Sequence, residues 1–163
     1  MHSFVGRAIA GAVFTAACLG ASPAWAEPVR EVYDPAQIRR VAASLPEAAI
    51  ARVEVARADP LNPLLRLVGT NGAEVFVQGA KCEAAGCRVA RFVGVSTPPS
   101  GMNRQDLADR HNEKPHWAVA IFDEGTLALR GELLFAGGIT DANLAQYIRS
   151  IVQQAAQLSA GRP

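Results

Sequence analysis

The sequence predicts an α+β protein in which an antiparallel sheet of about five strands carries its helices on one face. Two observations lead to this prediction. Residues 73–95 contain two alternating, β-branched runs around a four-residue loop, which is the pattern of a β-hairpin. Apolar residues at helical spacing recur before this hairpin, after it and near the end of the chain. The expected order of elements is α-β-β-β-α-β-β-α.

The first 26 residues have the pattern of a secretory signal peptide. Arg7 is the positive charge of a short amino-terminal region, residues 9–19 are apolar and rich in Ala, and residues 24–26 fit the small-x-small cleavage pattern. The apolar run is shorter than the about 20 residues that span a membrane. We therefore expect cleavage after Ala26, no integral membrane span in the mature protein, and one domain over residues 27–163, located in the periplasm or secreted.

Cys18 raises the alternative of a lipoprotein, because residues 15–18 resemble a lipoprotein acceptor site. Thr15 stands where a larger aliphatic residue is usual, which argues against this alternative. Removal of the leader also removes Cys18 and leaves Cys82 and Cys87. An even number of cysteines in an exported protein favours a disulfide. The two cysteines flank the hairpin loop, so their sulfur atoms are expected to face each other across the ladder.

Charge excludes two classes of partner. Without Arg7, 15 basic residues balance 15 acidic ones. A net charge near zero provides no electrostatic attraction for nucleic acid or for an anionic membrane.

The first helix is predicted to begin at Asp34 and Pro35 and to end before Pro46. Asp34 can cap the free backbone donors, and Pro35 suits the first helical position, where its missing N–H costs nothing. Residues 51–57 alternate apolar and charged side chains, as in a half-buried strand, and residues 64–68 form a second short strand.

Between that strand and the central hairpin, Asn71-Gly72 predicts a type I′ turn, which needs positive φ at both central residues. A polar helix is then expected over residues 103–114, with Asn103 as its cap and Pro115 after its end. Residues 116–122 and 126–135 predict a pair of strands joined by an acidic-Gly turn. Thr140 is expected to cap the last helix, whose apolar stripe consists of Leu144, Tyr147, Ile148, Ile151, Val152, Ala155 and Leu158.

This order of motifs resembles the YbjN domain family, described as putative bacterial sensory transduction regulators. The matching motifs are the cysteine pair, residues 109–112, residues 117–120, the acidic-Gly turn and residues 137–140. Compared with the family pattern, Asp109 replaces an asparagine, His111 a tryptophan and Trp117 a phenylalanine, whereas Asn112 is retained. The resemblance covers about residues 50–160. It implies a fold like that of the type III secretion chaperones, which often form dimers, and it implies no established chemistry.

Candidate chemistry is sparse. Redox-active cysteine pairs favour two intervening residues at a helix start, whereas four residues separate these two in a hairpin. A zinc site would use Cys82, Cys87, His111 and His116, but an oxidised cysteine pair cannot bind the metal. An enzyme would use His111 with Asp109 or Asp106, which share one helix and are typical of a solvated face with local ion pairs.

The sequence therefore predicts a non-catalytic binding or regulatory module without a cofactor, acting on a protein partner or as a homodimer. The expected recognition surface is the exposed sheet face or the polar helix. The candidate binding residues are Asp109, His111, Asn112 and Trp117. Trp117 is also expected to lie in the core, because aromatic residues supply much of the buried area of a small domain.

Overall fold

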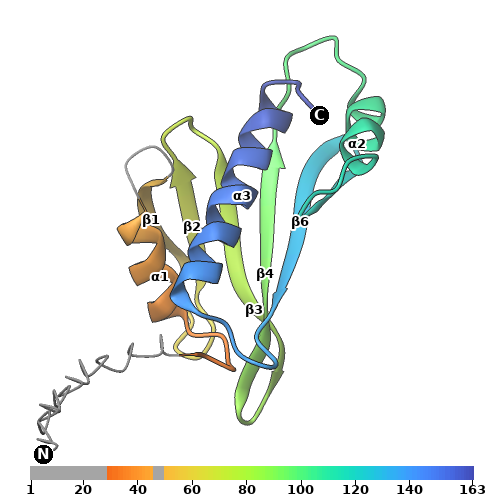
Figure 1. Ribbon diagram of the computed structural model, residues 1–163. Helices are drawn as coiled ribbons and strands as arrows, with labels where there is room; N and C mark the ends of the chain where they lie inside the picture. The colour runs from red at the N-terminus through yellow and green to blue at the C-terminus, as the bar shows by residue number, and fades with distance from the viewer. Residues whose placement is uncertain (1–28, 46–49) are drawn as a thin grey trace, which may run out of the picture.

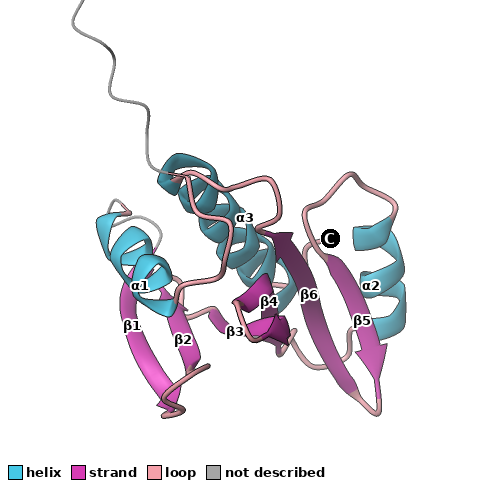
Figure 2. Cartoon of the chain, turned by 90° about the horizontal axis from the view of Figure 1, so that it is seen from below, coloured by secondary structure: helices cyan, strands magenta, loops and turns pink. Residues whose placement is uncertain are grey.

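Antiparallel strands in the order β1-β2-β3-β4-β6-β5 form one sheet at the centre of the computed structural model (Figure 1). The structure describes residues 29–45 and 50–163, so the predicted signal peptide and its cleavage site lie outside the described residues. Figure 2 shows α1 and α3 on one face of the sheet and α2 beside β5. The elements are α1 (Pro35–Ser44), β1 (Ile50–Arg57), β2 (Leu64–Gly69), β3 (Glu74–Glu83), β4 (Gly86–Ser96), α2 (Arg104–Asn112), β5 (Val119–Asp123), β6 (Thr126–Leu134) and α3 (Asp141–Ser159).

The α+β class and the antiparallel sheet with helices on one face are confirmed. The described residues contain six strands where about five were expected, because β1, β2 and both arms of the cysteine-bearing hairpin are separate strands. The observed order is thus α-β-β-β-β-α-β-β-α. All three predicted helix caps are present. Asp34, Asn103 and Thr140 each accept a hydrogen bond from a backbone N–H in the first turn of their helix.

The prediction of a type I′ turn at Asn71-Gly72 is wrong. Gly72 has φ +79°, but Asn71 is not among the residues with positive φ. The Asn71 side chain accepts a hydrogen bond from the N–H of Ala73 instead, at 3.0 Å, which holds Asn71 in an ordinary turn conformation. Among the hairpin turns, the one that joins β5 to β6 has positive φ at two successive residues, Glu124 (φ 46°) and Gly125 (φ 80°).

The core lies between the sheet and α3. The predicted apolar stripe of α3 is buried, as are Phe92 on β4 and Leu129 on β6. Two glycines allow this close packing. A Cβ atom on Gly94 would lie 3.0 Å from the Cβ of Ala155, and one on Gly131 would lie 2.5 Å from the Tyr147 hydroxyl. The helix therefore packs directly on the backbone of β4 and β6, and none of the described helices covers the opposite face of the sheet.

Candidate binding surface

Apolar side chains are exposed on the sheet face that carries no helix. The register places Val95 beside Ala128 and Ala128 beside Ile121, while Val119 lies beside Arg130 in the adjoining row. Val95, Val119 and Ile121 are 47%, 55% and 39% exposed. We call these three residues together with Trp117 the β5 patch. Four exposed apolar side chains at one end of a sheet cost solvation free energy unless a partner covers them.

Trp117 connects this patch to the helix-covered side. Its ring meets the ring of Tyr147 edge to face, with centroids 5.8 Å apart, and Tyr147 packs in turn on Phe92 at 5.0 Å. Trp117 remains 56% exposed, so the expectation that it lies in the core is wrong. Together with Val119, Ile121 and Arg130 it lines a hollow of about 480 Å³. One edge of the Trp117 indole therefore packs on Tyr147, and the rest of the ring is exposed and can contact a partner.

The other half of the same face is charged and internally paired. Arg66 donates to Glu54 at 3.0 Å and also to Glu74, and Arg52 lies 2.6 Å from Glu54. The hydrogen bond from Arg66 holds the pKa of Glu74 below its ordinary value. Nearer the patch, Arg91 pairs with Glu132 at 2.9 Å. These charges already have partners, whereas the apolar side chains of the β5 patch are exposed to solvent.

His111 and His116 are brought together, as a stacked pair. Their rings are nearly parallel, with centroids 4.0 Å apart, and His111 is fully buried. The Nε2 atom of His111 lies 3.3 Å from the carbonyl oxygen of Ala118. Burial lowers the pKa of both rings, and the positive charge of Lys114 lowers both further. The pair joins the end of α2 to the segment before β5, so β5 begins at Val119 and not at His116 as predicted.

Asn112 lies one residue further along α2 and pairs with the outer edge of β5. Its side-chain amide donates to the carbonyl oxygen of Ala120 and accepts from the N–H of Ala120, both at 2.8 Å. These two bonds replace those of a neighbouring strand and shield the edge. The candidate binding residues His111 and Asn112 therefore stabilise this part of the fold, His111 from a buried position and Asn112 from the exposed edge of the sheet.

The enzyme arrangement considered for this region is not formed. The carboxylate of Asp109 accepts a hydrogen bond from the Gln105 side chain at 2.8 Å, and Asp106 pairs with Arg110 at 3.0 Å. Neither carboxylate is a hydrogen-bond partner of His111, whose Nδ1 atom is buried and has no partner. A buried imidazole without an orienting carboxylate and without access to solvent is poorly suited to proton transfer. Asp109 contributes to the surface of α2 alone.

Cys82 and Cys87 form a disulfide across the hairpin. Their Cα atoms are 3.8 Å apart, and the two residues are direct partners in the β3–β4 ladder, as predicted. The zinc arrangement is not assembled. In residues 29–45 and 50–163, no group of three or more His, Cys, Asp and Glu side chains is placed to hold a metal ion.

No protein-family model matches the chain. No curated protein matches it either. Among the described helices, none combines the length and the apolar character that crossing a membrane requires.

Sequence reasoning missed most of the β5 patch. It selected Trp117, but not Val95, Val119 or Ile121. Val119, Ala120 and Ile121 are all apolar, so the sequence does not show whether Ala120 or its two neighbours face the helices. Only the position of Ala120, buried between β6 and Asn112, identifies Val119 and Ile121 as the exposed pair.

Proposed function

We propose that this chain is an exported, non-catalytic binding module that recognises a protein through the β5 patch. The observation that carries the proposal is the grouping of Val95, Val119 and Ile121, exposed on the sheet face that no described helix covers, with the exposed Trp117 beside them. The neighbouring ion pairs add a polar rim, an arrangement typical of protein interfaces. Trp117 supplies the aromatic anchor that such interfaces favour.

Export and family membership are part of the same proposal. The leader of residues 1–26 and the disulfide both fit an oxidising compartment outside the cytoplasm. The order of motifs that resembles the YbjN family is compatible with a sensory or chaperone-like role. In that role, the module changes the state of a partner by binding it, and performs no chemistry of its own.

Site-specific cross-linking tests the patch. A photoreactive amino acid at position 121 is expected to yield a discrete cross-linked product in producing cells, and Val119→Lys is expected to abolish it. The same amino acid at position 113, on the exposed end of α2, is the control. A product of twice the chain mass would identify the partner as a second copy. Equal cross-linking from both positions, or none from position 121, would refute a role for the patch.

A further inference from the structure

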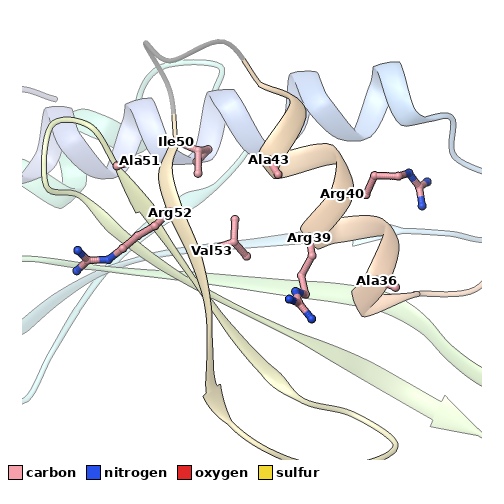
Figure 3. Close-up of a pocket in the computed structure, with 8 residues that line it drawn as sticks. All are labelled: Ala36, Arg39, Arg40, Ala43, Ile50, Ala51, Arg52 and Val53. Atoms are coloured by element: carbon pink, nitrogen blue, oxygen red, sulfur yellow. The ribbon is translucent and has the colours of Figure 1, made fainter.

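A groove separates α1 from β1, at the opposite end of the sheet from the β5 patch. It has a volume of about 570 Å³, and its walls include Ala36 and Ala43 of α1 and Ile50 and Val53 of β1 (Figure 3). The groove exists because α1 turns its large apolar residues, Ile38 and Val41, into the core. The flank that remains beside β1 carries alanines, which are too small to close the gap.

The strand that borders this groove has a free edge. β1 pairs with β2 and with no other strand in the described part of the chain. The backbone N–H of Gly69 donates to the carbonyl oxygen of Ala73, on the β3 side of β2. Backbone N–H and C=O groups point to alternate sides along a strand, so those of Arg66, three residues earlier, point toward β1. Glu54, opposite Arg66, therefore bonds to β2. Val53 and Val55, on either side of Glu54, point their backbone N–H and C=O groups away from the sheet.

The same groove holds a cation with no counterion. Figure 3 shows Arg39 extending from α1 into the space beside β1, whereas Arg40 and Arg52 point away from it. Arg40 pairs with Asp141 at 3.0 Å and Arg52 with Glu54 at 2.6 Å. Within residues 29–45 and 50–163, Arg39 has neither an ion pair nor a hydrogen bond from its side chain. Among the described residues that line the groove, none is acidic.

We propose that this groove binds an extended, acidic segment of a partner protein as an additional strand beside β1. The backbone of the segment bonds to Val53 and Val55, as in strand-addition complexes. Its apolar side chains fill the space against Ala36, Ala43 and Val53, and a carboxylate pairs with Arg39. Each component of the groove then meets its complement: free backbone groups, an apolar wall and an unpaired guanidinium. This surface is separate from the β5 patch and does not depend on it.

The test begins with random decapeptides displayed on phage and selected on the purified chain. Enriched peptides are synthesised with a fluorescent label, and their affinities are measured by anisotropy. We expect enrichment of Asp and Glu within alternating apolar sequences, and affinity about tenfold weaker for Arg39→Glu. The matched control is Arg149→Glu, which makes the same charge change at an exposed position on α3 and should leave the affinity unchanged.

Amide hydrogen exchange locates the bound peptide. Exchange at Val53 and Val55 should slow when the peptide is added, and methylation of the peptide backbone nitrogens should remove both the protection and the binding. The proposal is overturned if enriched peptides lack acidic residues or bind Arg39→Glu as tightly as the unmodified chain. It is overturned equally if Ile121→Lys abolishes binding, because the peptides would then occupy the β5 patch.

Discussion

The Asn112 side chain makes the two backbone hydrogen bonds that a neighbouring strand would otherwise make to β5. Its amide satisfies both backbone groups of Ala120 at the outer edge of β5. We expect Asn112→Ala to lower the free energy of unfolding by about 1–2 kcal/mol, because two hydrogen bonds are lost and an edge residue is left unpaired. Urea denaturation measures this. Glu113→Ala, the adjacent exposed position, is the control, and identical unfolding curves for the two variants would contradict the assigned role.

The stacked histidines make stability depend on pH. Burial lowers the pKa of His111 and His116 in the fold, so the unfolded chain takes up protons at a higher pH than the folded chain does. Stability is therefore complete above the ordinary histidine pKa of about 6.5 and is lost as the pH falls below that value. The free energy of unfolding should be lower at about pH 5.5 than at about pH 7.5.

His116→Phe should reduce that difference, because the variant keeps a ring stacked on His111 but removes one titrating group. Urea titrations of both proteins at the two pH values make the comparison. The carboxylates are common to both proteins, so their effect cancels. An equal loss of stability in the two proteins would argue against the pair as its source.

At the scale of elements, the packing of α3 on β6 depends on the absence of a side chain at Gly131. A Cβ atom there would lie 2.5 Å from the Tyr147 hydroxyl and 2.9 Å from Cδ1 of Ile151. Gly131→Ala should therefore cost about 1–3 kcal/mol through overpacking. The Tyr147 hydroxyl is buried without a partner, and burial raises its pKa to about 12. Its removal in Tyr147→Phe should cost little.

A double-mutant cycle tests this contact. Gly131→Ala should be less damaging in the Tyr147→Phe background, with the remainder of the cost due to Ile151. Additive effects of the two substitutions in thermal or urea unfolding would show that the hydroxyl does not limit the approach of the helix.

The β3–β4 hairpin is stabilised by its disulfide. On the chain-entropy model, a bridge across so short a loop contributes roughly 2 kcal/mol. Cys82→Ser with Cys87→Ser should lose about this amount in urea, and a reductant should have no further effect on that variant. In the full-length chain, a thiol reagent under denaturing conditions should count the thiol of Cys18 before reduction and all 3 cysteines after it. Finding every thiol free before reduction would contradict the bridge.

For the molecule as a whole, the leader predicts export with cleavage after Ala26. Mass spectrometry of the amino-terminal peptide from the exported fraction should find Glu27 as the first residue. Ala26→Tyr, which places a large residue at the cleavage position, should retain the leader. Accumulation of the unprocessed chain in the cytoplasm for both proteins would remove the basis for an exported module.

Local signals explain which parts of the fold could be predicted. Asp34, Asn103 and Thr140 cap their helices through bonds to residues two or three positions away, so the relevant chemistry lies within a short window. Cys82 and Cys87 are close in sequence, and the hairpin pattern is enough to pair them. The turn at Asn71 failed as a prediction because its side chain had a competing local hydrogen bond. The residue types Asn and Gly indicate that a turn forms here, but they do not decide between a type I′ turn and a turn closed by the Asn71 side chain.

The sequence by itself determined the class of fold, the helices with their caps, and the cysteine pair, because periodicity, capping and short-range pairing are properties of neighbouring residues. Only the tertiary structure decided which side chains became surface. The stacking of His111 on His116, the bond between Asn112 and Ala120, and the seat of α3 on Gly131 join segments whose relative positions depend on the packing of the whole sheet. Among the described residues, that packing leaves Val119, Ile121 and Arg39 without partners, because the helices cover one face of the sheet and the flank of α1 beside β1 carries alanines, which leave the groove open.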